Sequence, residues 1–176
     1  TPAIAVSRST AEDLVQNGIP RDNLVIAPPG LDQGVHRTGL AEKATKPLVV
    51  VCSRLKRYKR VDLAIKALAH LRVSVPDASM VVIGEGNERA RLEGLAKATK
   101  EPVTFLGYVG QAEKARWLNR AHVVLNPSTK EGWGMVALEA MACGTPVVAS
   151  DVPGHRDSVP EGVGIRVKAG DARAMA

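Results

Sequence analysis

The sequence predicts an α/β fold: a Rossmann-like, three-layer α/β/α sandwich around a mainly parallel sheet of about six strands. Two observations favour this fold class. Short apolar runs alternate with amphipathic segments along most of the chain, and turn residues such as Gly and Pro separate them. Strands that alternate with helices form parallel sheets whose two faces are covered by the helices. A chain of 176 residues is also long enough for one domain, residues 1–176, with a core of its own.

The expected elements follow one another in chain order. The first core strand, 48–53, is apolar throughout, as expected for a strand that is buried on both faces. The first core helix, 61–71, carries its leucines and alanines at helical spacing on one face. The further expected strands are 80–84, 103–106, 123–126, 146–150 and 164–167. The further expected helices are 88–99, 111–120 and 134–143.

The first thirty residues are less regular. Residues 3–7 form a short apolar run, and 24–27 read as a strand that Pro28-Pro29-Gly30 ends. Between them, Ser9 and Glu12 match a capping box at a helix start. Gly18 fits the end of that helix.

Two other segments have a different character. Residues 32–46 show no periodicity and are expected to form a mobile loop. Residues 170–176 resemble the start of a helix, because a Gly-Asp step opens an Ala-rich run. We therefore expect this chain to be a piece of a longer protein.

The charge pattern favours a small anionic ligand. The net charge is +6, and the one dense basic cluster spans residues 54–60. A nucleic-acid surface would interleave cations with aromatic side chains, but aromatic residues make up only 3% of the sequence. We therefore expect no nucleic-acid partner. The alternative for the cluster is a solvated surface run.

The cysteines and histidines indicate neither disulfides nor metal. Cys52 and Cys143 fall within expected core elements, so a reducing cytoplasm is the default location. The histidines share no ligand spacing with them, which makes a zinc site improbable. The apolar runs are far too short to span a bilayer, and no signal-peptide pattern opens the chain.

Candidate ligand groups follow the expected strands. In an open parallel sheet, ligands bind outside the carboxyl ends of the strands. Glycines, cations and acids gather after these ends, and they are expected to share one edge of the sheet. The residues in question are Arg54, Lys59, Gly84, Gly86, Tyr108, Val109, Glu131, Gly132 and Gly134.

The helix expected to begin near Gly134 suits a phosphate. Gly132 and Gly134 allow the backbone to approach a ligand closely. The free amides of Gly134, Met135 and Val136 and the positive end of the helix dipole can accept an anion. The loop and helix start therefore predict a phosphate site.

Four charged side chains complete this hypothesis. Arg54 and Lys59 can neutralise a diphosphate. Glu139 can accept hydrogen bonds from a ribose diol, and Glu131 from the hydroxyls of a second ring. Each of these residues has an alternative: surface charge for the two cations, and a helix-surface acid for Glu139. Their coincidence on one edge favours the ligand site.

The two best-known nucleotide fingerprints are missing. The sequence contains neither the complete dinucleotide-binding pattern nor a P-loop. This argues against an NAD enzyme and against an NTPase. An epimerase of the dinucleotide-binding type would also need a tyrosine–lysine catalytic pair that this chain does not show.

The run from Pro127 to Ser150, PSTKEGWGMVALEAMACGTPVVAS, closely resembles the signature of retaining family-4 glycosyltransferases of the GT-B fold. Its two glutamates, Glu131 and Glu139, are eight positions apart, as in that signature. Other segments match the family in the same order, so the resemblance covers nearly the whole chain. These segments are 6–9, 29–32, 53–62, 83–86, 103–107 and 152–159.

The resemblance implies the donor-binding half of an enzyme that transfers a hexosyl group from a UDP- or GDP-sugar, with retention. By resemblance, Arg54 and Lys59 hold the diphosphate, Glu139 the ribose and Glu131 the donor sugar. The amides of Met135 and Val136 join the phosphate cradle. No cofactor and no metal are expected, since family members generally need none.

Around the base, Val109 and its neighbour Tyr108 are expected to line the pocket, with Gly84 and Gly86 close to the nucleotide. Some guanine-specific relatives carry an acid shortly after the position of Val109. Here Gly110 and Gln111 follow, which favours a uridine donor slightly.

The resemblance also implies an N-terminal acceptor-binding domain and a returning C-terminal helix, and we expect both to lie outside residues 1–176. We therefore expect the isolated domain to bind donor weakly and to transfer nothing. Two alternatives remain open: a non-catalytic nucleotide-sugar-binding module and a UDP-sugar epimerase-like GT-B protein. The expected location is cytoplasmic, with peripheral contact of the full-length protein to the membrane left open. The base, the sugar and the acceptor are not defined by the sequence.

Overall fold

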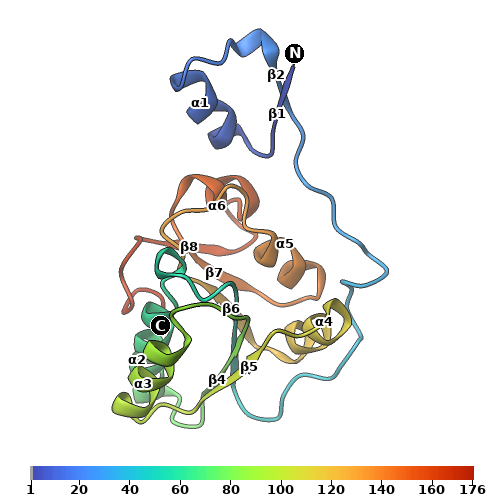
Figure 1. The fold of residues 1–176 in the computed structure, drawn as a ribbon. Coiled ribbons are helices and arrows are strands. Elements are labelled where there is room, and N and C mark those ends of the chain that lie inside the picture. Colours follow the sequence, from blue (N-terminus) through green and yellow to red (C-terminus); the bar gives the residue numbers. More distant parts are fainter. Residues whose placement is uncertain (1) are drawn as a thin grey trace.

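The structure, a computed structural model, describes residues 2–176 and is built around one six-stranded sheet (Figure 1). All neighbouring strands in this sheet are parallel, in the order β5-β4-β3-β6-β7-β8. The Rossmann-like fold predicted from the sequence is confirmed. The strands are β3 (Leu48–Cys52), β4 (Ser79–Ile83), β5 (Val103–Gly107), β6 (Val123–Asn126), β7 (Val147–Ser150) and β8 (Ile165–Val167).

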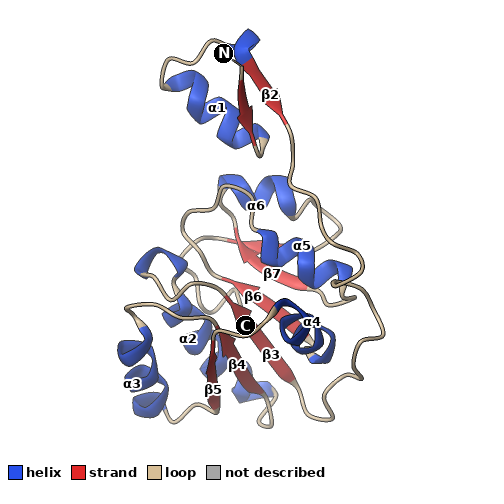
Figure 2. Cartoon of the chain, turned by 45° about the vertical axis from the view of Figure 1, so that its right-hand side comes forward, coloured by secondary structure: helices blue, strands red, loops and turns tan. Residues whose placement is uncertain are grey.

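Helices cover both faces of the sheet, as Figure 2 shows. On one face lie α2 (Val61–Ser74) and α3 (Arg89–Thr99), and on the other lie α4 (Gln111–Arg120) and α5 (Met135–Ala142).

Strand β3 shows why both faces are apolar. Val49 and Val51 pack into the core under α2 and α3, whereas Val50 packs under α4 and α5. Successive side chains of a strand point to opposite faces, so a strand between two helical layers must be apolar throughout. The predicted core elements differ from the observed ones by at most one residue at each end, except that α2 runs on to Ser74.

Residues 3–26 form a separate β-α-β unit. It consists of β1 (Ala3–Ala5), α1 (Arg8–Gln16), a short 3-10 turn and β2 (Leu24–Ile26), and β1 pairs only with β2. In Figures 1 and 2 the unit lies beyond α6 (Pro153–Ser158), at the end of the molecule away from α3. Asp157 of α6 connects the two parts, because its Oδ2 accepts hydrogen bonds from both Ser9 N (3.1 Å) and Ser9 Oγ (2.7 Å).

The capping box predicted at the start of α1 is wrong. The N-cap is Ser7, whose extended backbone precedes the helix and whose Oγ accepts a hydrogen bond from Thr10 N at 3.0 Å. Ser9 lies inside the helix, and its hydroxyl is directed to Asp157 instead. Gly18 follows the helix with φ of +93°, as the prediction of a helix end required.

The segment 27–47 joins β2 to β3 without a helix or strand, as predicted for most of its length. It is tied to the core at Lys43, whose Nζ donates to Ala121 O at 2.6 Å and to Thr145 Oγ1 at 2.8 Å. At the other end, Asp171 Oδ1 accepts hydrogen bonds from the amides of Arg173 and Ala174. Asp171 thus caps a turn, in keeping with the helix start predicted there.

The strand order indicates at which edge of the sheet a ligand would bind. The chain starts the sheet at β3, adds β4 and β5 on one side, and then returns to add β6, β7 and β8 on the other. The crevice outside the carboxyl ends of β3 and β6 is therefore the topological switch point, where ligands bind in such sheets.

Candidate functional site

A cavity of about 310 Å³ opens at this switch point. It is bounded by the carboxyl ends of β3 and β4, the turn after β5, and the first turns of α4 and α5. The structure thus brings together Arg54, Gly84, Tyr108, Val109 and Val136 from the predicted site. The other residues in its wall are Cys52, Ser53, Ile83, Glu85, Gln111 and Lys114.

Arg54 and Tyr108 are the exposed groups of this cavity. The guanidinium of Arg54 donates from Nη2 to Tyr58 Oη at 2.7 Å, which leaves its other donors available to an anion. The ring of Tyr108 is largely exposed at the rim, beside Val109. An exposed aromatic ring next to apolar side chains is a suitable surface for a planar base.

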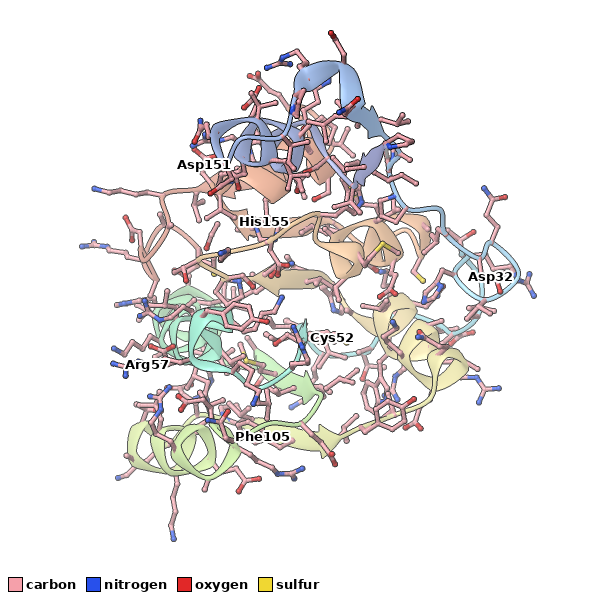
Figure 3. The ribbon with its side chains drawn as sticks, turned by 45° about the horizontal axis from the view of Figure 1, so that its top comes forward. Asp32, Cys52, Arg57, Phe105, Asp151 and His155 are labelled. Atoms are coloured by element: carbon pink, nitrogen blue, oxygen red, sulfur yellow. The ribbon has the colours of Figure 1, made fainter. Side chains whose placement is uncertain are left out.

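Lys59 and Glu131 form an ion pair, and neither residue is part of the cavity wall. Lys59 ends the 3-10 turn η2 (Arg57–Lys59), and Glu131 lies in the loop between β6 and α5. Lys59 Nζ contacts Glu131 Oε1, and their side chains are only 13% and 12% exposed. The surface-charge alternative does not describe Lys59, because its cation is held by this carboxylate. In Figure 3, Arg57 marks the turn that carries Lys59.

The start of α5 offers unpaired amides. Gly134 is the N-cap, with φ of +93° and no side chain capping the helix. A Cβ at this position would lie 2.8 Å from His155 Cδ2, so only glycine fits. The amides of Met135 and Val136 therefore lack a side-chain cap, which is the arrangement that binds phosphate groups in proteins, and Val136 borders the cavity.

The glycines after β4 differ in their contacts from Gly132, which lies in the loop between β6 and α5. A Cβ at Gly84 would lie 1.9 Å from Ser53 O, and one at Gly86 would lie 2.2 Å from Leu55 O. These two glycines therefore let the loop after β4 pack directly on the backbone after β3. A Cβ at Gly132, in contrast, would have room, because the nearest atom, Val6 Cγ2, would lie 3.8 Å from it. Only Gly84 among the three borders the cavity, so the ligand-binding roles of Gly86 and Gly132 stay predictions.

Glu139 is buried, so it is not a helix-surface acid. It lies on the second turn of α5, and Lys114 Nζ donates to its Oε1 at 2.6 Å. His36 Nε2, from the segment 27–47, lies 3.8 Å from the same oxygen. Oε2 has no hydrogen-bond partner among the described residues. A buried carboxylate normally has both oxygens satisfied, so the unpartnered Oε2 is an exception that needs an explanation.

Sequence reasoning missed three residues around the site: Lys114, His36 and His155. Lys114 lies on the first turn of α4, directly after the predicted base pocket, and this position was its only signal. His36 comes from a segment without periodicity, and His155 from a short helix. The only signal for His155 was its place in segment 152–159, which resembles the family, and nothing around His36 separates it from an ordinary loop residue.

His155 packs against Gly134, at the start of α5. It is fully buried, and its Nδ1 donates to Ser150 O at 2.8 Å, which requires the proton on that nitrogen. Burial lowers the pKa of His155, so the ring is neutral at pH 7. Figure 3 shows it in α6, between the N-terminal unit and the sheet.

Cys52 is the thiol of the cavity wall. It ends β3 near the centre of the molecule in Figure 3. Burial raises its pKa to about 11, so the thiol is protonated at neutral pH. Cys52 and Cys143 are both free. In the part of the chain that the structure describes, no three His, Cys, Asp or Glu side chains gather as a metal site would require.

Comparison with known proteins identifies the family. The family described as glycosyl transferases group 1 matches residues 32–176. The chain belongs to this family. This confirms the resemblance read from residues 127–150.

Two similar sequences are named glycosyltransferases. A D-inositol 3-phosphate glycosyltransferase of Pseudarthrobacter chlorophenolicus is 37% identical over 166 residues, which covers 86% of this chain and 40% of that protein. A GDP-mannose-dependent alpha-(1-6)-phosphatidylinositol dimannoside mannosyltransferase of Mycobacterium tuberculosis is 45% identical over 107 residues, 60% of this chain and 28% of that protein. The chain thus spans less than half the length of these curated relatives.

Solved structures share the fold. HepE of Anabaena, in complex with UDP and glucose, superposes with a TM-score of 0.88 at 24% identity, covering 99% of this chain and 51% of that one. Sucrose-phosphate synthase of Thermosynechococcus elongatus superposes with a TM-score of 0.83 at 27% identity, covering 98% and 46%. No helix within residues 2–176 has the length and apolar character needed to cross a bilayer.

Proposed function

We propose that this chain is the donor-binding part of a glycosyltransferase that transfers a hexosyl group from a UDP- or GDP-sugar, with retention. One observation carries the proposal. The cavity at the switch point places an exposed guanidinium, an uncapped helix start and an aromatic rim around one space of about 310 Å³. A nucleoside diphosphate can use all three, since its phosphates need cations and amides and its base needs an aromatic or apolar surface.

The nucleotide is proposed to lie with its base against Tyr108 and Val109. Its diphosphate reaches Arg54 and the amides of Met135 and Val136. Arg54 and the helix end then stabilise the negative charge that develops on the leaving diphosphate, which is the catalytic contribution available to this part. Glu139 accepts hydrogen bonds from the ribose.

The sugar is proposed to lie at the Lys59–Glu131 pair. Because Lys59 already holds Glu131, a donor phosphate that arrives next to Lys59 would share its charge and free the carboxylate for sugar hydroxyls. The pair can therefore exchange one internal contact for two ligand contacts. This is how a partly buried ion pair can take part in binding without leaving a charge unpaired.

Two bases, guanine and uracil, are candidates for the donor nucleotide. The mycobacterial relative named above is GDP-mannose-dependent, whereas HepE was solved with UDP. Gly110 and Gln111 after the base pocket favour uridine slightly. Acceptor binding and transfer are proposed to need a second domain, of the kind that the greater length of the relatives can accommodate.

Isothermal titration calorimetry with UDP, GDP, ADP and the corresponding hexose conjugates tests the proposal. We expect one nucleoside diphosphate to bind with 1:1 stoichiometry and to raise the melting temperature as occupancy increases. Lys59→Gln should weaken binding, while Lys56→Gln, an exposed cation in the same segment, is the matched control. Absence of heat and of any thermal shift with every nucleotide would refute the function.

Transfer is tested separately, with the radiolabelled sugar of whichever donor binds. We expect no transfer by this chain alone to inositol phosphate or water. Detectable transfer would overturn the proposed need for a second domain while leaving donor binding intact.

A further inference from the structure

The carboxylate of Glu139 is satisfied on one side only. Its side chain is 8% exposed, and burying a carboxylate is unfavourable unless a cation and hydrogen bonds compensate it. Lys114 Nζ supplies the cation at 2.6 Å from Oε1, and the Lys114 side chain is itself 11% exposed. Oε2 is equally enclosed but has no partner among the described residues. The described part of the protein thus gives one oxygen a partner and leaves the other enclosed without one.

Three separate segments meet at this carboxylate. Glu139 comes from α5, Lys114 from α4 and His36 from the loop that follows β2. His36 Nε2 lies 3.8 Å from Oε1, the oxygen that Lys114 holds, and neither ring nitrogen has a hydrogen-bond partner within residues 2–176. Both neighbours therefore stand on the Oε1 side.

Lys114 connects this cluster to the cavity. It is the one member of the three that borders the 310 Å³ space, next to Cys52 and Val136. A lysine fixed on Oε1 also fixes the rotation of the carboxyl group, because a strong charge-assisted hydrogen bond has a preferred direction. The orientation of Oε2 is then set before any ligand arrives.

We propose that Lys114 and His36 are positioning residues, which hold Glu139 so that Oε2 alone is presented to the ribose hydroxyls of the nucleotide. The inference rests on the proposed function and deepens it. Lys114 restrains the carboxylate by its hydrogen bond to Oε1, and His36 encloses the occupied oxygen. Together they make the site selective for ribose over deoxyribose, because 2′-deoxyribose lacks one of the two hydroxyls that can donate to the oriented oxygen.

Calorimetric titration with UDP and 2′-deoxy-UDP, and with GDP and 2′-deoxy-GDP, tests this selectivity. For the unaltered chain we expect the ribonucleotide to bind about tenfold more tightly or better, the effect of one hydrogen bond to a charged group. Lys114→Gln should bring this ratio close to one, and His36→Phe should reduce it in part. Lys114→Arg, which keeps a cation that can reach Oε1, should restore most of the selectivity.

Lys66→Gln is the matched control. Lys66 is exposed on α2, which covers the other face of the sheet, so its removal changes the net charge equally without touching Glu139. We expect it to leave the ratio unchanged. If Lys114→Gln weakens both nucleotides by the same factor, Lys114 acts through charge alone, and the positioning role is overturned.

Unfolding by urea gives a second readout that needs no nucleotide. Lys114→Gln, Glu139→Gln and the double variant form a thermodynamic cycle. We expect the double variant to lose much less free energy of unfolding than the sum of the losses in the two single variants. Additive losses would show that the two residues do not act together and would overturn the inference. If no nucleotide binds the unaltered chain but the coupling is present, it is the proposed function that fails, and the selectivity for ribose with it.

Discussion

Gly154→Ala should displace the loop between β6 and α5, although Gly154 is not part of the cavity wall. Gly154 lies in α6, and its backbone is packed against the loop after β6. A Cβ at Gly154 would lie 2.3 Å from Glu131 O, 2.7 Å from Glu131 C and 2.8 Å from Gly132 C. All three are backbone atoms, which cannot turn aside as a flexible side chain can.

The required displacement follows from these distances. Real Cβ atoms essentially never approach another heavy atom within 3.0 Å. The carbonyl of Glu131 must therefore move by about 0.7 Å, the difference between 3.0 Å and 2.3 Å. Overpacking of this kind costs about 1–3 kcal/mol. For a chain of this size, a loss of 1 kcal/mol lowers the melting temperature by about 2–4 °C, so we expect a decrease of about 2–12 °C.

The same shift should affect sugar binding more than nucleotide binding. Glu131 is the proposed sugar contact, and one hydrogen bond to a charged group contributes about 1.5–3 kcal/mol. Calorimetry should therefore show that the advantage of the nucleotide sugar over the free nucleoside diphosphate falls by about tenfold or more. The affinity for the nucleoside diphosphate itself should change little.

Gly94→Ala is the matched control for this substitution. No atom lies within 4 Å of a Cβ at Gly94, which is in the middle of α3, so the same chemical change should stabilise the helix by up to about 1 kcal/mol. An unchanged melting temperature together with an unchanged sugar advantage in Gly154→Ala would refute the reasoning. A lower melting temperature alone would confirm the clash but remove Glu131 from the sugar site.

Three further changes test other parts of the structure. Because burial raises the pKa of Cys52 to about 11, against 9.0 for an ordinary thiol, we expect iodoacetamide at pH 8 to alkylate it about a hundred times more slowly than a free thiol; equal rates by mass spectrometry would contradict this. Burial lowers the pKa of His155, so the unfolded chain binds its proton first as the pH falls. The free energy of unfolding, measured with urea, should then decrease below about pH 6.5, and it should decrease more steeply than in His155→Gln. Parallel pH profiles of the two proteins would argue against a buried, neutral His155. Leu68→Ala, at a fully buried position of α2, should cost about 2–5 kcal/mol in urea unfolding, and a loss below 1 kcal/mol would show that the core collapses into the space.

Much of the fold could be predicted because its signals are local. The uniformly apolar run of β3 and the helical spacing in α2 each reflect burial that the element imposes on its own residues. The start of α1 shows the limit of such signals. Ser7 and Ser9 are both good capping residues, and the choice between them depends on Asp157, which is 148 residues from Ser9 along the chain.

The site could be predicted in part, for a similar reason. Gly134 and Glu139 belong to one continuous run whose loop, helix start and acid follow each other directly. The environment of Glu139 could not be predicted, because Lys114 and His36 reach it from 25 and 103 positions away along the chain. A pairing of that kind exists only after helices α4 and α5 and the loop before β3 have packed together.

The order of the sheet has a consequence for how this chain folds. Pairing of β3 with β6 joins Val49 to Val123, the longest separation between any two neighbouring strands of the described sheet. Closing so long a loop is entropically unfavourable and slow, so the halves β3–β5 and β6–β8 are expected to organise before their seam forms. The crevice described above lies on that seam. A nucleotide bound there would bridge the two halves, and amide hydrogen exchange across β3 and β6 should slow more than exchange in β5 or β8 when it binds.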